Sequence, residues 1–127
     1  MRSDWRDAID RDDAAAAADL LDAGAEVNAR DEYGQTGLMN AARDGRTAVA
    51  RLLVGRGADL DVAAKYGLTA LMLAVLRSHI EIVRILVDAG ADLDARGTGA
   101  PAFHGKTAFD LARELESIAL IEILRRE

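Results

Sequence analysis

The chain has 127 residues, room for one compact domain, and carries a net charge of −6 from 16 basic and 22 acidic residues. Cysteine is absent, which excludes disulfides and thiolate metal sites. The acidic balance argues against binding to nucleic-acid phosphates, and no apolar run approaches the roughly 18 residues that cross a bilayer. These features predict a cytoplasmic protein that binds neither nucleic acid nor membrane.

Residues 1–29 are expected to form a first pair of helices. Ser3 is the predicted N-cap of the first helix, with Asp4 and Asp7 in the first turn, where the helix dipole favours negative charge. The second helix is expected at residues 14–21. Small and acidic residues such as Ala16 and Asp19 stand where later segments have large apolar ones. This pattern predicts an end unit that no preceding unit covers.

Residues 30–62 form the second predicted unit. Thr36 is the expected cap of its first helix, and Gly45 is expected to make the turn between its two helices. The inward-facing residues, at helical spacing, are Leu38, Ala41, Ala42, Val49, Leu52 and Leu53.

Residues 63–95 repeat this pattern as the third unit. Its first helix, within TALMLAVL, is apolar nearly all round, as expected of a helix packed between neighbours. The second helix carries an apolar stripe and stops at Gly90. Ser78 replaces the glycine of the turn, and His79 after it is expected to hydrogen-bond that turn.

Residues 96–127 form the fourth predicted unit, which contains an insertion. The spacing from Gly67 to Gly105 is 38 residues rather than 33, so five extra residues lie in the loop 97–105. The segment KTAFDLAR then begins a closing helix pair, whose last helix should turn Ile118, Ile121 and Leu124 inward. This unit is expected to cap the other end of the chain.

The constant step predicts a stacked array rather than an irregular helical bundle. The steps match at Gly34 and Gly67 and at Thr36 and Thr69, and the motifs are DEYGQTGL at 31–38, AARDG at 41–45 and GAD at 57–59. By these motifs the chain resembles the ankyrin repeat family over essentially its whole length. The resemblance implies an all-α solenoid of stacked helix–turn–helix pairs joined by finger loops. We expect a monomer with four repeats, at approximately 1–29, 30–62, 63–95 and 96–127.

The chain departs from the family pattern after Thr36, where Gly37 and Met39 stand in place of the usual proline and histidine. Because glycine lacks the preset φ of proline and methionine loses a polar link, we expect a looser helix start there. Asn28 lies at a position that Asp61 also holds one step later. The resemblance implies that this side chain hydrogen-bonds the backbone of a turn.

Catalytic and cofactor sites are not expected. Two histidines without cysteine do not favour a metal site, and no Ser, His and Asp have the spacing of a nucleophile and its base. The loop from Gly99 to Thr107 is similar to a phosphate-binding loop. However, it has five residues between its glycines, where four are required. Nucleotide binding in this loop remains an alternative, and an enzyme is not predicted.

The resemblance implies a concave face, made of finger tips and the exposed side of the first helices, that grips a partner protein. Tyr33 and Tyr66 lie one step apart at the tips, and His104 holds the same place after Phe103. Leu68 and Leu76 are expected to stand exposed beside Tyr66 as an apolar patch. The predicted partner-binding residues are Glu32, Tyr33, Gln35, Arg43, Asp44, Lys65, Tyr66, Leu68, Leu76, Arg77, Phe103, His104 and Lys106.

The predicted function is therefore a non-catalytic protein–protein interaction module without cofactors. A narrower alternative is a small bacterial immunity or regulatory protein that neutralises a basic partner, which the acidic composition favours. The other alternative is a structural or engineered scaffold with no native ligand. The sequence does not identify the partner protein.

Overall fold

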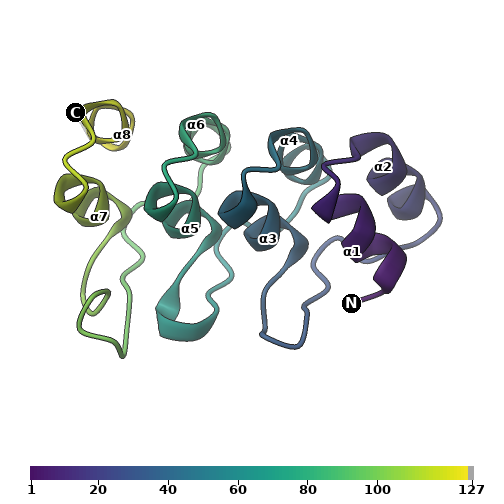
Figure 1. Ribbon diagram of the computed structural model, residues 1–127, viewed down its shortest axis with the longest axis horizontal. Coiled ribbons are helices and arrows are strands. Elements are labelled where there is room, and N and C mark those ends of the chain that lie inside the picture. The colour runs from purple at the N-terminus through teal and green to yellow at the C-terminus, as the bar shows by residue number, and fades with distance from the viewer. Residues whose placement is uncertain (126–127) are drawn as a thin grey trace.

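The computed structural model describes residues 1–125, so the last two residues of the fourth predicted unit lie outside it. In this described part, eight α-helices pair into four units that lie side by side in a row (Figure 1). The expected all-α solenoid of stacked helix pairs is confirmed. The helices are α1 Ser3–Asp10, α2 Ala14–Asp22, α3 Gly37–Asp44, α4 Thr47–Gly55, α5 Ala70–Leu76, α6 Ile80–Asp88, α7 Ala108–Glu114 and α8 Ile118–Leu124, with a 3₁₀ turn η1 at Lys65–Gly67.

The four units form two layers of helices. The first helices α1, α3, α5 and α7 pack on one another in sequence, and the second helices α2, α4, α6 and α8 do the same. Three loops project from the layer of first helices on the same side of the row (Figure 1). We call them finger one (residues 31–36), finger two (64–69) and finger three (97–106). Because each unit packs on its neighbours, every finger inherits its position from the helix pairs beside it.

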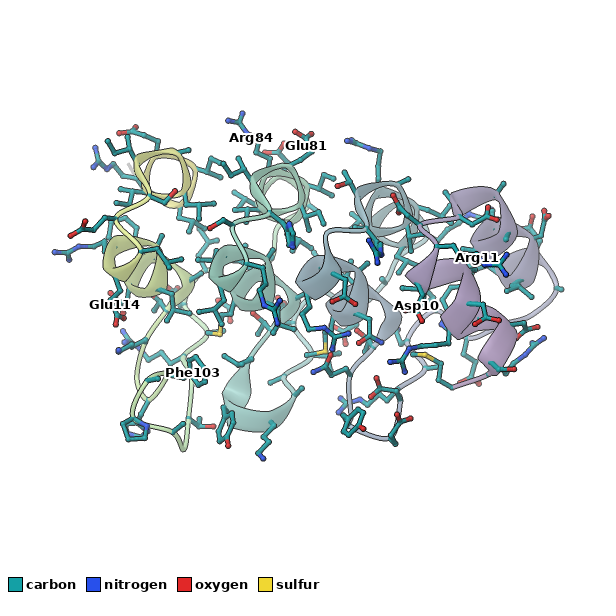
Figure 2. The ribbon with its side chains drawn as sticks, in the orientation of Figure 1. Asp10, Arg11, Glu81, Arg84, Phe103 and Glu114 are labelled. Atoms are coloured by element: carbon teal, nitrogen blue, oxygen red, sulfur yellow. The ribbon has the colours of Figure 1, made fainter. Side chains whose placement is uncertain are left out.

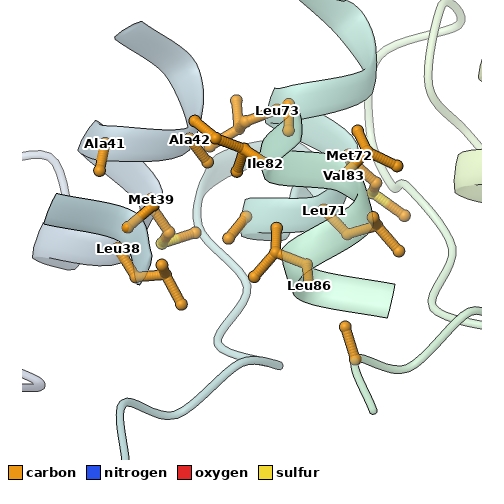
Figure 3. Close-up of a cluster of buried hydrophobic side chains, with 14 of the residues drawn as sticks. Leu38, Met39, Ala41, Ala42, Leu71, Met72, Leu73, Ile82, Val83 and Leu86 are labelled. Atoms are coloured by element: carbon orange, nitrogen blue, oxygen red, sulfur yellow. The ribbon is translucent and has the colours of Figure 1, made fainter. Parts of the chain in front are cut away.

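The core is continuous along the row. Figure 3 shows one cluster of buried side chains that includes Leu38 and Met39 of α3, Leu71 of α5, and Ile82 and Leu86 of α6. Burying one such side chain contributes roughly 1.5–3 kcal/mol. Alanines fill the narrowest parts of the interface, and their small side chains allow neighbouring helices to approach closely; the buried ones include Ala41, Ala42, Ala50 and Ala74.

Threonine side chains cap α3, α5 and α7, as predicted for Thr36. The Oγ1 atoms of Thr36 and Thr107 accept hydrogen bonds from the backbone N–H groups of Met39 and Asp110, both at 3.2 Å. The Asp110 carboxylate in turn accepts a hydrogen bond from Thr107 N at 3.0 Å. At α3 the Met39 sulfur accepts from Thr36 N at 3.4 Å. The expected loss of a polar link at Met39 is therefore wrong, because the thioether takes the place of the usual acceptor.

The predicted cap of α1 is wrong. Arg2 is the N-cap residue, without a side-chain cap bond, and Ser3 is already the first helical residue. The Asp4 carboxylate accepts the free backbone N–H of Trp5 at 2.8 Å, which satisfies one of the donors that Ser3 was expected to take. The next helix, α2, is capped by Asp13, which accepts from Ala16 N at 3.0 Å.

The turn between the two helices is left-handed in every unit. The residues at this position have φ values of 55° at Asp12, 74° at Gly45, 57° at Ser78 and 55° at Glu116. Only glycine adopts this conformation without a steric cost, and for other residues the cost is about 1–2 kcal/mol. Three of the four turns therefore hold a strained residue.

The His79 ring also favours glycine at position 45, because it leaves no room there for a side chain. A Cβ at this position would lie 2.7 Å from Cε1 of His79, whose ring covers the turn. The same ring places Nε2 3.0 Å from the carbonyl oxygen of Arg43, so His79 joins the third unit to the second. His79 was expected to hydrogen-bond its own turn at Ser78; its ring instead bonds Arg43 of the preceding unit.

Replacing Ser78 with glycine should raise the free energy of unfolding by about 1 kcal/mol, because the exposed Ser78 is strained at φ 57°. Urea denaturation would measure the gain. Asp12→Gly relieves the same strain but removes the carboxylate that accepts from Val49 N at 2.9 Å and caps α4. We therefore expect a smaller gain or a loss for Asp12→Gly. Equal gains in the two variants would contradict this account of the turns.

Only part of the apolar stripe predicted for α8 is buried. Leu120 and Leu124 of α8 are buried, but Ile118 is 77% exposed, so its predicted place in the inward stripe is wrong. The reason lies in the register, because Ile80 at the same position of α6 is also exposed. This position is in the first turn of the second helix and faces solvent. Leu115 is also exposed, so the fourth unit presents two large apolar side chains to solvent.

Candidate functional site

The predicted partner-binding residues lie on the fingers and on the ends of the first helices, and we call this set the finger face. None of its thirteen residues is buried. Tyr33 is 70% exposed in finger one and Tyr66 is 37% exposed in finger two. The two fingers project on the same side of the row (Figure 1), as the one-step spacing of these tyrosines predicts.

Finger one is organised by a buried carboxylate that the sequence analysis did not single out. Asp31 Oδ1 accepts from the backbone N–H groups of Tyr33 at 2.9 Å and Gln35 at 3.0 Å. Asp31 Oδ2 lies 3.4 Å from both Arg6 Nη1 of α1 and Asn40 Nδ2 of α3. One side chain therefore joins the first unit, the finger and the second unit.

Burial alone would raise the pKa of Asp31, but hydrogen bonding outweighs it. The N–H groups of Gln35 and Tyr33, the Asn40 amide and the charge of Arg6 together hold the pKa of Asp31 below its ordinary value of 3.8. A signal for this role was present in the sequence, since an Asp just before a turn commonly accepts from the turn backbone.

Arg43 fixes the end of α3 behind finger one. Its Nε and Nη2 donate to the two carboxylate oxygens of Asp44 at 3.0 and 2.9 Å, and its Nη1 donates to Gln35 Oε1 at 2.8 Å. The hydrogen bonds from Arg43 hold the pKa of Asp44 below its usual range. Three predicted partner-binding residues are therefore already bonded to one another, which leaves Glu32 and Tyr33 as the exposed part of this finger.

Finger two holds its tyrosine in an unusual backbone conformation. Tyr66 has φ +64°, in the left-handed region, within the turn η1. Its carbonyl oxygen accepts from Thr98 N at 2.7 Å, and its ring centroid lies 5.8 Å from that of Phe103. The Lys65 ammonium lies 5.0 Å from the Tyr66 ring centroid, within the range of a cation–π contact. Fingers two and three are thereby fastened together.

Finger three contains the five inserted residues, and its backbone bonds to itself. Gly97 N donates to Lys106 O and Gly105 N donates to Gly97 O, both at 2.9 Å. A Cβ at Gly97 would clash with the carbonyl oxygen of Phe103, so only glycine fits there. At the base of the loop, Lys106 Nζ pairs with Glu114 Oε1 at 2.8 Å. Figure 2 shows Phe103 on this loop, at the finger side of the row.

The expected exposed patch at Leu68 and Leu76 is wrong. Both side chains are half-buried and pack against the core, as does Phe103. Leu68 directly precedes Thr69, the buried cap of α5, so the chain is already returning to the helix layer there. The apolar surface of the finger face is therefore supplied mainly by the tyrosines.

Within residues 1–125, no three His, Asp or Glu side chains are placed to hold a metal ion, and no helix is long and apolar enough to cross a membrane. Cavities of about 280 and 440 Å³ lie toward the two ends of the row, beside Phe109 and Trp5, and a shallow one of about 370 Å³ lies beside Lys106 and Glu114 at the base of finger three. In the inserted loop, the amides of Gly105 and Lys106 already bond to carbonyls, whereas a phosphate-binding loop offers its amides to the ligand.

Asn28 has the structural role that its position predicts. Its Oδ1 accepts from Asp59 N at 2.8 Å, and Asp61 Oδ1 accepts from Asp92 N at the same distance one unit later. These bonds link the loop that ends one unit to the corresponding loop of the next.

The family model described as ankyrin repeats, in three copies, matches residues 6–97, which is more than half of the chain. The match ends where the inserted loop begins and the spacing of the motifs changes. A comparison with curated proteins gives no match.

Proposed function

The chain belongs to the ankyrin repeat family, and we propose that it is a monomeric, non-catalytic module that binds a partner protein along the finger face. Ankyrin repeats generally serve as protein–protein interaction modules. The proposed setting is the reducing cytoplasm, which suits a chain without cysteine.

The observation that carries this proposal is the exposure of Tyr33. Its side chain is 70% exposed, while its backbone N–H is held by the buried carboxylate of Asp31. An aromatic ring presented to water on a fixed backbone is suited to bind a partner, because little backbone freedom remains to be lost on binding. Tyrosine is also among the residues that most often dominate the energy of interfaces.

The other fingers support the same proposal. Tyr66 presents a partly exposed ring beside Lys65, and the half-buried ring of Phe103 packs against it. Because all three fingers project on one side of the row (Figure 1), one partner surface could contact them together. Such an interface would combine aromatic and charged groups, as interfaces between proteins commonly do.

Changing Tyr33, Tyr66 and Phe103 together to alanine should weaken the complex at least tenfold, or by about 1.4 kcal/mol or more, since the proposed contact rings are removed. Partners captured on the immobilised protein from cells of origin would be identified by mass spectrometry, purified, and titrated calorimetrically against each variant. The matched control is Leu115→Ala with Ile118→Ala, which removes exposed apolar side chains outside the finger face. A folded triple variant that binds like the wild type would contradict the proposal.

A narrower candidate is a regulatory or immunity protein that neutralises a basic partner. Its support is the net charge of −6 and the exposed carboxylates of the first unit, such as Asp7 and Asp19. Long-range attraction of this kind is screened by salt. A complex whose association rate is the same at low and high ionic strength would count against this candidate.

A further inference from the structure

Unit three carries positive charge on the finger face that nothing in the described part of the chain neutralises by direct contact. Lys65 and Arg77 are both exposed, and neither forms an ion pair within residues 1–125. Asp44 is the carboxylate whose pKa Arg77 helps to lower, but both of its oxygens are taken by Arg43. Elsewhere on the face the cations are paired: Arg43 with Asp44, and Lys106 with Glu114.

The acidic excess of the chain lies elsewhere. Carboxylates are placed on the second helices and on the loops that follow them, and include Asp19, Asp59, Asp61, Glu81, Asp88 and Glu122. Figure 2 shows Glu81 and Arg84 at the edge of the row opposite to Phe103. The local charge beside Tyr66 therefore has the sign opposite to that of the protein as a whole.

Contacts with finger three fix the backbone of Tyr66 and pack its ring. Tyr66 keeps a left-handed backbone, its carbonyl is bonded by Thr98, and its ring rests on Phe103. A non-glycine residue in this conformation is disfavoured, and such residues are found preferentially at functional sites. The ring remains 37% exposed, so one part of it is covered by finger three and another part is available to a partner.

We infer that fingers two and three, together with Arg77 at the end of α5, bind an acidic segment of a partner protein. Carboxylates of the segment meet Lys65 and Arg77, and an apolar side chain of the segment lies on Tyr66. This inference rests on the proposed function and specifies the chemistry of the segment that fingers two and three bind; it is separate from the basic-partner candidate, which rests on the acidic first unit. Nucleic acid is the other common polyanion, but an acidic protein with few free cations is poorly suited to a long row of phosphates.

A library of random peptides displayed on phage tests which peptide chemistry this surface selects. It is selected in parallel on the wild-type protein, on Lys65→Glu and on Arg84→Glu. Lys65 and Arg84 are both exposed, and both changes replace a cation with a carboxylate, but Arg84 lies on α6 away from the fingers (Figure 2). We expect the wild type and Arg84→Glu to recover peptides that combine Asp or Glu with an apolar residue, and Lys65→Glu not to recover them.

The outcomes separate the inference from the proposed function. Peptides that need Tyr66 and Phe103 but are not acidic, or that bind Lys65→Glu equally well, would overturn the inference and leave the proposed function standing. Peptides that bind independently of every finger would count against both. Recovery of no peptide above the background of Lys65→Glu would also overturn the inference.

The size of the effect is measured with one recovered peptide made synthetically. Lys65→Glu should raise its Kd about tenfold or more, and Arg84→Glu should change it less than about twofold, since an attraction becomes a repulsion only at the contact. Replacing the Asp and Glu of the peptide with Asn and Gln should remove the difference between wild type and Lys65→Glu. A labelled single-stranded oligonucleotide that binds more tightly than the peptide, and depends on Lys65, would overturn the choice of a protein segment.

Discussion

Replacing Trp5 with alanine should lower the free energy of unfolding by about 3–5 kcal/mol, the range measured for fully buried large side chains. Trp5 is 1% exposed, in α1. Trp5 and Ile9 pack against the start of α3. A Cβ built at Gly37 would lie 3.4 Å from Trp5 Nε1 and 2.9 Å from Ile9 Cδ1. The space that a side chain at residue 37 would fill is already taken by the first unit. Glycine at position 37 therefore lets α1 and α3 pack closely at this point.

Trp5→Ala should destabilise the N-terminal unit of the row first. Units of a solenoid contact only their neighbours, so removing Trp5 should let α1 and α2 unfold before the rest. Urea denaturation followed by circular dichroism would show an early step that the wild type lacks. Trp5→Phe, which keeps most of the apolar volume, is the matched control and should lose less. A single transition at the wild-type midpoint for Trp5→Ala would contradict this account.

Replacing Asp31 with alanine should lower the free energy of unfolding by about 2–3 kcal/mol, because buried groups lose their partner. The change leaves the N–H groups of Tyr33 and Gln35, the Asn40 amide and Arg6 without their acceptor. Finger one should also become mobile, since these bonds hold its backbone. Chemical denaturation gives the stability, and faster amide exchange at Tyr33 and Gln35 would report the finger directly.

The pH dependence of this effect has a definite sign. Because hydrogen bonds hold the folded-state pKa of Asp31 below 3.8, the stability that Asp31 contributes is complete above that pH and is lost as the pH falls through the lower folded value. Asp31→Asn should show a weaker loss of stability in acid than the wild type. It can still accept from the finger backbone, so at neutral pH it should be more stable than Asp31→Ala. Identical acid unfolding of wild type and Asp31→Asn would contradict the role of this carboxylate.

The helices and their register could be predicted from the sequence because the signals are local and repeat at a fixed step. Thr36 caps α3 as expected, and α2 runs Ala14–Asp22 where residues 14–21 were predicted. The errors arose where several donors or acceptors compete. At the start of α1 the carboxylate of Asp4 acts in place of Ser3, and at Met39 a sulfur atom accepts a bond that the residue type does not suggest.

The contacts within the candidate site were less predictable because they join residues without a recognisable pattern. The fastening of Tyr66 by Thr98 depends on how the inserted loop folds, and the spacing of the motifs indicated only the size of that insertion. Likewise, the exposure of Ile118 depends on which turn of α8 it occupies, whereas its apolar character suggested an inward position. The partner-binding role of the finger face stays a prediction.

The fastening of fingers two and three has a consequence for the thermodynamics of binding. The Tyr66 ring already rests on Phe103, whereas finger one has a fixed backbone but leaves the Tyr33 ring in solvent. A partner would therefore meet one aromatic ring that already packs on a neighbouring ring and one that is surrounded mainly by solvent. Most of the side-chain entropy lost by these two rings on association would come from Tyr33, so the entropy of binding should respond to changes at Tyr33 more than to changes at Tyr66.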